Sequence, residues 1–117
     1  MLAAHTDDRI SNLFKVIGDP FRVCLLLALV DNEACVCHLE RLLGRRQAFI
    51  SQHLMSLREA GVLTARREGK YIFYRVKDRK LPGLILRAAE MAGLRRADLD
   101  TLPRKVNPAN CKCPHCA

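Results

Sequence analysis

The stretch "ISQHLMSLREAGVLTARREGKYIFYRV", residues 50–76, carries the clearest structural pattern of this chain. In its first half, Ile50, Leu54 and Leu57 recur at the spacing of one face of an α-helix. Its second half holds two β-prone runs around "REGK", with Gly69 in the turn, which is the pattern of a β-hairpin. The stretch therefore predicts a helix followed directly by a hairpin that carries basic residues.

Further helices are predicted before that stretch. Apolar residues recur at helical spacing over residues 6–17, and an Asp-Pro pair then opens a helix that we expect to reach residues 31–32. The run "CVCHLERLLG", residues 35–44, predicts a short helix ended by its glycine. The helix that contains Ile50, Leu54 and Leu57 is predicted over residues 45–61. Helix, turn, helix and basic hairpin in this order indicate a winged helix-turn-helix.

The last third of the chain divides into an apolar helix and a tail. "LPGLILRAAEMAGLRR", residues 81–96, is apolar around much of its circumference, which predicts burial against something larger than one small domain. Residues 97–117 are polar and rich in proline and cysteine, and we expect a flexible extension. We therefore predict a mainly α domain with a small β-hairpin wing over residues 1–96, followed by a cysteine-bearing tail over 97–117.

The charge and the outward face of the helix at 45–61 point to double-stranded DNA. The chain has a net charge of +8 and an isoelectric point near 9.6, so its favoured partners are polyanions. Small, amide and hydroxyl side chains lie opposite the apolar stripe and suit insertion into a groove of the duplex. The predicted DNA-binding residues are Arg45, Arg46, Gln47, Phe49, Ser51, Gln52, His53, Arg66, Arg67 and Lys70.

Two of these residues have an alternative role that stays open at this point. Phe49 either contacts a thymine methyl group or lies against a neighbouring helix. His53 lies at the edge of the apolar stripe, where packing and a phosphate contact are equally expected.

Composition excludes several other classes of protein. A chain of 117 residues forms one domain, and no apolar run approaches the roughly 20 residues that span a bilayer. The first residues lack the pattern of a secretory signal, so we expect a cytoplasmic protein with reduced thiols and no membrane partner. "CPHC", residues 113–116, has the spacing of thiol–disulfide oxidoreductases, but no helix follows it to lower the pKa of its first thiol, so we expect no enzyme.

Three segments together resemble the ArsR/SmtB family of metal-sensing bacterial repressors: "FKVIGDPFRVCLLLAL", "EACVCHLERLLG" and "QAFISQHLMSLREAGVLTARREGKYIFYRV". The resemblance covers about residues 13–76. It implies a homodimer that is joined through the first and last helices and bound to a palindromic operator. It also implies that an inducer ion loosens this complex, without any organic cofactor.

The resemblance further implies that Cys35 and Cys37 sense a soft ion. Arsenite-type members continue this pattern as C-x-C-x-x-C, but Glu40 occupies the third position here. As(III) and Sb(III) favour three thiolates, and Cd(II) and Pb(II) commonly take three or four. The helix at 81–96 has no His and no Asp, which disfavours a zinc site there. We therefore predict that the two cysteines bind the ion together with cysteines of the tail, which are Cys111, Cys113 and Cys116.

Two other uses of the cysteines stay open. A thiol-redox-sensing repressor would form a disulfide in place of the ion complex. A structural zinc site in the tail, with a different inducer, is the second alternative. Cys24 lies in an apolar run and is predicted to be a packed thiol outside any site.

Overall fold

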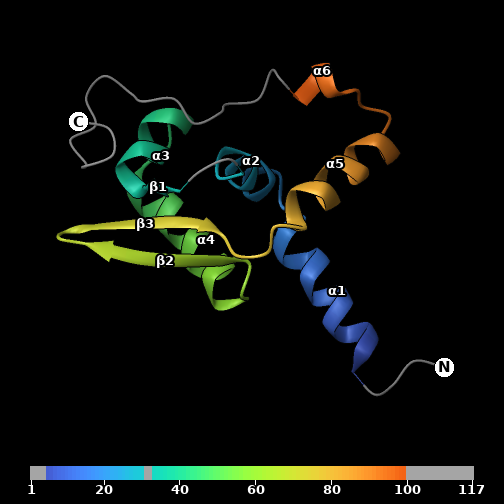
Figure 1. The fold of residues 1–117 in the computed structure, drawn as a ribbon, viewed down its shortest axis with the longest axis horizontal. Coiled ribbons are helices and arrows are strands. Elements are labelled where there is room, and N and C mark those ends of the chain that lie inside the picture. The colour runs from blue at the N-terminus through green and yellow to red at the C-terminus, as the bar shows by residue number, and fades with distance from the viewer. Residues whose placement is uncertain (1–4, 31–32, 100–117) are drawn as a thin grey trace.

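The computed structural model describes residues 5–30 and 33–99 as a mainly helical domain with a small antiparallel sheet (Figure 1). The strand order in the sheet is β1-β3-β2. This arrangement confirms the predicted winged helix. The elements are α1 (Thr6–Ile17), α2 (Pro20–Ala28), β1 (Ala34–Cys35), α3 (Val36–Leu43), α4 (Gln47–Glu59), β2 (Leu63–Glu68), β3 (Tyr71–Val76), α5 (Leu81–Met91) and α6 (Arg96–Leu99).

The wing is the hairpin of β2 and β3. Its two strands pair in antiparallel register from Leu63 opposite Val76 to Glu68 opposite Tyr71. The turn between them contains Gly69, whose φ of 60° lies in the left-handed region that glycine adopts without strain. The prediction of a hairpin around "REGK" is confirmed, although its first strand starts one residue later and runs further than expected.

Strand β1 was not predicted. It consists of two residues, and it pairs with β3 so that Ala34 lies opposite Tyr74 and Cys35 opposite Phe73. As a consequence α3 starts at Val36, one residue later than expected, and Cys35 becomes the N-cap of that helix. A two-residue strand is too short for the alternation of apolar and polar residues that identifies a strand in a sequence.

The core lies where α3, α4 and the sheet meet. Ile50, Leu54 and Leu57 of α4 are fully buried, which confirms the predicted apolar stripe of this helix. Leu39 of α3 is also fully buried in the same cluster, together with residues of α2. The buried stripe holds α4 against α3 and the sheet and leaves its opposite face at the surface.

Helix α5 is shorter than the sequence pattern predicts. It ends at Met91 and not at Arg96, because Gly93 has a φ of 82°. The N–H of Leu94 donates to the carbonyl of Ala89 at 2.9 Å, and the N–H of Gly93 donates to that of Glu90 at 3.0 Å. This pair of bonds is a Schellman motif, which satisfies the last carbonyls and stops the helix. The short helix α6 follows at Arg96–Leu99, at the start of the expected extension.

Helices α1 and α5 lie at the opposite end of the molecule from the wing (Figure 1). Both helices leave large apolar side chains exposed. No helix within the described ranges has the length and the apolar character needed to cross a membrane.

A cluster of aromatic rings fixes the first turns of α4 against α2. The ring of Phe49 lies 4.8 Å from that of Phe21 and 4.7 Å, edge to face, from that of His53. The guanidinium carbon of Arg45 lies 5.1 Å from the centre of the Phe49 ring and 5.6 Å from that of Phe21. Of the two alternatives for Phe49, this geometry favours packing against a neighbouring helix over a contact with thymine.

The packing of Phe49 gives a prediction about stability. Phe49→Leu removes two ring–ring contacts, so we expect the free energy of unfolding to fall by about 1–2 kcal/mol. Urea denaturation followed by circular dichroism measures this change. Met55→Leu, on the exposed face of the same helix, is the control and should change it by less than about 0.5 kcal/mol. If Phe49→Leu leaves stability unchanged but weakens DNA binding, the ring serves DNA contact and not packing.

Candidate nucleic-acid interface and metal centre

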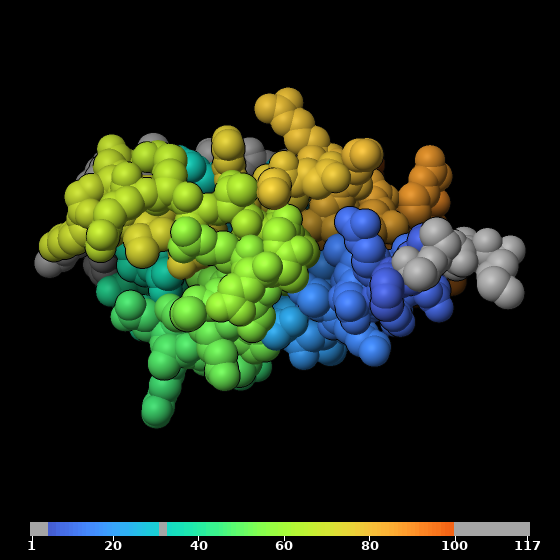
Figure 2. All heavy atoms as spheres, turned by 90° about the horizontal axis from the view of Figure 1, so that it is seen from below, coloured from blue at the N-terminus to red at the C-terminus, as the bar shows by residue number. Residues whose placement is uncertain are grey.

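Helix α4 presents a polar face at the surface. Figure 2 shows this helix, in green, between the wing and α1. Gln47, Gln52 and Met55 are exposed, and Ser51 is half-buried. The hydroxyl of Ser56 donates to the backbone carbonyl of Gln52 at 3.1 Å. The outward face therefore offers the amide of Gln52 and the hydroxyl of Ser51, which are groups that recognise base edges and phosphates in the major groove.

His53 is held by an arginine that the sequence reasoning missed. The Nε–H of Arg22 donates to Nδ1 of His53 at 3.0 Å, and Nη1 of Arg22 donates to the carbonyl of Val16 at 3.0 Å. Because Nδ1 accepts, the proton of the neutral imidazole is on Nε2, and that N–H is a hydrogen-bond donor. Arg22 thus ties α1, α2 and α4 together. No local signal identifies this contact, because the two residues are 31 positions apart.

The arginines of the wing differ in their surroundings. Arg67 and Lys70 are exposed, and Nζ of Lys70 lies 5.5 Å from the centre of the Tyr71 ring. Arg66 instead forms an ion pair with Glu33, whose two carboxylate oxygens each accept from Nε at 3.0 Å. Its guanidinium carbon lies 4.8 Å from the centre of the Phe73 ring. Arg66 therefore links the wing to the segment before β1, and its contact with DNA stays a prediction.

The hydrogen bond that Arg66 donates to Glu33 raises the pKa of Arg66 above its ordinary value, so this guanidinium remains charged. The second carboxylate nearby is that of Glu68, with Oε2 at 3.5 Å from Nη1 of Arg66. Two acidic side chains thus compensate its charge.

A second set of basic residues, on β3 and in the connection that follows it, was also missed. Arg75, Lys77 and Arg79 line a groove together with Arg66 and apolar side chains such as Leu29. Arg75 lies on β3, whereas Lys77 and Arg79 follow the end of that strand, so the alternation of a single strand does not identify the set. These residues extend the positive charge of the wing towards α5.

The structure brings the two cysteines of the "CVC" segment together. Cys35 is buried and Cys37 half-buried, neither is part of a disulfide, and their sulfur atoms are 2.7 Å apart. Cys35 caps α3, since its Sγ accepts a hydrogen bond from the backbone N–H of His38 at 3.4 Å. Phe73 and Tyr71 of β3 pack around the pair. The site thus joins the end of β1, the first turn of α3 and the wing.

Within residues 5–30 and 33–99, no group of three or more His, Cys, Asp or Glu side chains is arranged to hold a metal ion. The site itself has two sulfur donors, Cys35 and Cys37, and a three-thiolate site needs a further one. Glu40 is half-buried on α3, one turn beyond Cys37. The other predicted ligands, Cys111, Cys113 and Cys116, lie outside the described residues.

The remaining predicted residues lie close to these groups. Arg46 is exposed and precedes α4 as its N-cap, without a capping bond from its side chain. Arg45 is exposed and lies over the aromatic cluster. Cys24 is half-buried in α2, where burial raises its pKa, so its thiol keeps its proton at neutral pH. This supports its assignment as a packed thiol.

Comparison with known proteins gives the family. A family model described as "Bacterial regulatory protein, arsR family" matches residues 19–65. The transcriptional repressor SmtB of Mycobacterium tuberculosis is 35% identical over 86 residues, which are 74% of this chain but only 64% of that protein. The arsenical resistance operon repressor of Escherichia coli is 43% identical over 65 residues, 55% of this chain and 56% of that one.

A solved structure agrees with these relatives. The transcriptional repressor BigR from Xylella fastidiosa superposes with a TM-score of 0.66 and 35% identity, over 73% of this chain and 87% of that one. All of these relatives are transcriptional regulators and not enzymes. The chain therefore belongs to the arsR family of bacterial regulatory proteins, as its winged helix and its helix-turn-helix residues indicate.

Proposed function

We propose that this chain is a metal(loid)-responsive transcriptional repressor. It binds palindromic operator DNA as a homodimer and is released when As(III) or Sb(III) binds the thiolates of Cys35 and Cys37 with cysteines of residues 111–116. The observation that carries the proposal is the position of the two thiols, 2.7 Å apart at the first turn of α3. That helix packs directly on α4.

The donor set fits a soft ion. Thiolate sulfur is a soft ligand, and trivalent arsenic and antimony are soft centres, so the two match in preference to oxygen or nitrogen donors. The separation of the two sulfurs is well above the roughly 2.0 Å of a disulfide, and both lie on one short segment. Cys35 and Cys37 therefore supply two donors at one point, and one tail cysteine completes a set of three.

The two cysteines are placed to pass a change on to the DNA-binding elements. Sγ of Cys35 accepts a hydrogen bond from the N–H of His38, and this bond caps α3. When an ion draws the sulfur away, the helix loses this cap. The same displacement also pulls on the pairing of Cys35 with Phe73 of the wing. To shift the ratio of the released to the DNA-binding conformation from 1:99 to 99:1, the ion has to bind the released conformation about 5.5 kcal/mol more tightly. Several metal–thiolate bonds can supply this difference.

The outward face of α4 and the basic residues of the wing support the DNA complex. α4 would enter the major groove with Gln52 and Ser51 outward, and the wing would lie along the phosphate backbone with Arg67 and Lys70. In a dimer the two α4 helices would occupy half-sites one turn of DNA apart, roughly 34 Å. A change at α3 that alters their separation would release the operator.

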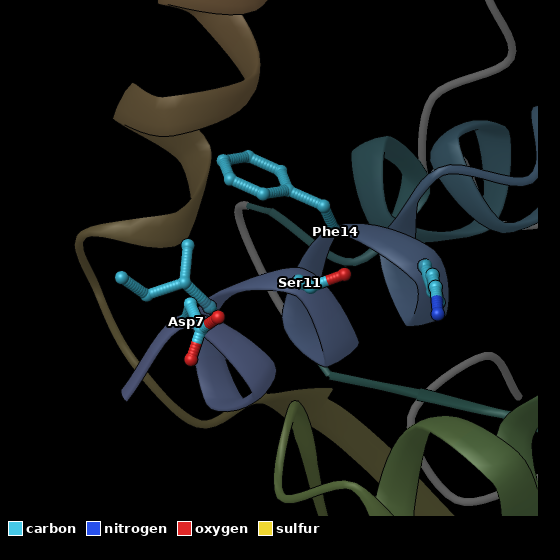
Figure 3. A pocket seen from close by; sticks show the side chains of 5 residues that line it. Asp7, Ser11 and Phe14 are labelled. Carbon is cyan, nitrogen blue, oxygen red and sulfur yellow. The ribbon is translucent and has the colours of Figure 1, made fainter. Parts of the chain in front are cut away.

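The exposed apolar side chains of α1 and α5 support the homodimer. Ile10, Leu13 and Phe14 of α1 are 50%, 40% and 54% exposed, and Leu84 of α5 is 36% exposed. Figure 3 shows Phe14 on α1 beside α5, at a hollow lined by Asp7, Ile10, Ser11, Phe14 and Lys15. Exposed apolar residues gathered on two neighbouring helices mark a protein–protein interface, and a second copy of the same surface would cover them.

Two alternatives use the same thiols. Cd(II) or Pb(II) can take three or four thiolates and would serve as inducer in the same way. A redox sensor is favoured by the close approach of the two sulfurs. In that case hydrogen peroxide would accept two electrons from the thiols, its O–O bond would break, and its oxygens would take up the two thiol protons, so that one disulfide and two water molecules form.

The ion proposal predicts the behaviour of single cysteine variants. Under reducing conditions, As(III) should release the wild-type protein from a labelled operator duplex, as measured by fluorescence anisotropy. Cys37→Ser should bind DNA as tightly but resist release, because it provides one thiolate fewer. Cys24→Ser is the matched control and should respond as the wild type does. Normal release from Cys37→Ser would contradict the assignment.

Two further arms of this experiment separate the alternatives. A chain truncated after Asn110 should also fail to respond to As(III), since it lacks the tail cysteines. Cd(II) and Pb(II) are titrated in parallel to identify the ion. Release by peroxide alone, with no uptake of As(III), would favour the redox sensor.

The DNA surface predicts a difference between two variants. Arg67→Ala should weaken binding to every duplex and lower the slope of log K against log[salt] by about 0.9 for each phosphate that the side chain no longer neutralises. Gln52→Ala should instead reduce the preference for the operator over random DNA, because it removes a hydrogen bond to a base edge. Salt titrations on both duplexes test this. Equal weakening on both duplexes for Gln52→Ala would contradict its role in base recognition.

The proposed assembly predicts the effect of one charge on α1. Phe14→Asp places a carboxylate in the apolar surface and should convert the dimer to a monomer, as measured by sedimentation equilibrium. Asn12→Asp adds the same charge to the same helix outside the hollow and is the control, which should stay dimeric. A monomeric wild-type protein, or a dimeric Phe14→Asp, would exclude this interface.

A further inference from the structure

Met55 stands apart from the other exposed apolar side chains in the described ranges. It lies on α4 and is 56% exposed. The other large hydrophobic residues with comparable exposure lie on α1, on α5 or in the turn after α5, at the end of the molecule that we assign to the dimer. These residues are Ile10, Leu13, Phe14, Leu84, Met91 and Leu94. The dimer surface therefore does not account for Met55.

The position of Met55 on α4 places it in the DNA-facing stripe. Ala48, Gln52 and Met55 are spaced four and then three residues apart, so they lie along one side of the helix. The stripe of Ile50, Leu54 and Leu57 on the other side is fully buried. Met55 is therefore the neighbour of Gln52, one turn further along the same surface.

We propose that Met55 is a specificity-determining residue that contacts the C5-methyl group of a thymine in the major groove. The inference rests on the proposed function, in which α4 enters that groove. The methyl group is the apolar feature that distinguishes thymine at the groove floor, and an apolar side chain recognises it by removing both surfaces from water. Methionine suits this contact because its unbranched, polarisable side chain adapts to the position of its partner.

The spacing of Gln52 and Met55 sets which bases they reach together. Three residues of α-helix advance about 4.5 Å along the axis, while successive base pairs are about 3.4 Å apart. Gln52 and Met55 therefore reach the same base pair or adjacent ones. An amide that pairs with an adenine and a thioether on a thymine methyl would together select A·T pairs within each half-site.

Replacement of thymine by uracil tests the contact, because it removes only the methyl group. A palindromic duplex is selected by the wild-type protein from a random library and resynthesised with one thymine at a time replaced by uracil. For the wild type, we expect one such replacement in the half-site to weaken binding about fourfold, the effect of removing one buried methyl group. For Met55→Ala the same replacement should leave the affinity unchanged. For Met55→Leu the replacement should again weaken binding, but by less than in the wild type.

The design contains its own controls. Uracil at thymines outside the half-sites should affect neither protein. Since Met55 is exposed, Met55→Ala should keep the thermal unfolding curve of the wild type. If no replacement acts on the wild type more than on Met55→Ala, the inference is wrong even though the protein binds its duplex. If the wild-type protein selects no duplex at all, the proposed function itself fails, and this outcome is separate from the first.

Discussion

The pairing of Cys35 with Phe73 is the contact on which the proposed coupling between the cysteine site and the DNA-binding surface depends. Through its backbone Cys35 belongs to the sheet, and through its sulfur it caps α3. Its side chain packs with Phe73 in a small cluster separate from the main core. A displacement of this one residue therefore acts on both the wing and the helix that supports α4. A ligand site at this point needs no long pathway to reach the DNA-binding elements.

A second connection runs parallel to this pairing. Glu33 precedes β1 by one residue and binds Arg66 of β2, and the guanidinium of Arg66 lies over the ring of Phe73. The wing thus contacts the cysteine segment through a backbone ladder and an ion pair, while the cation–π contact lies within the wing, between β2 and β3. An exposed ion pair of this kind contributes little to stability, so the ladder and the apolar packing carry most of the connection.

Much of the fold could be predicted from the sequence because its signals are local. The stripe of α4 and the hairpin turn at Gly69 follow from periodicity and from backbone preference, and both are confirmed. Strand β1 escaped prediction because its stability comes from pairing with β3, about forty residues later in the chain. The hydrogen bond between Arg22 and His53 was not predicted for the same reason, since its two residues are far apart in the sequence. Such contacts depend on tertiary structure and leave no pattern in a single segment.

The division of exposed side chains over the surface fits the two partners that we propose, a second copy of the chain and operator DNA. Apolar residues on α1 and α5 favour a surface that leaves water permanently, whereas amides, hydroxyls and arginines on α4 and the wing keep their hydration until DNA replaces it. Arg22 bridges the two regions by joining the end of α1 to His53 on α4. The orientation of α4 relative to the proposed dimer surface is therefore fixed by a hydrogen-bonded link as well as by packing. A repressor that has to match two half-sites at once, as we propose, depends on that orientation.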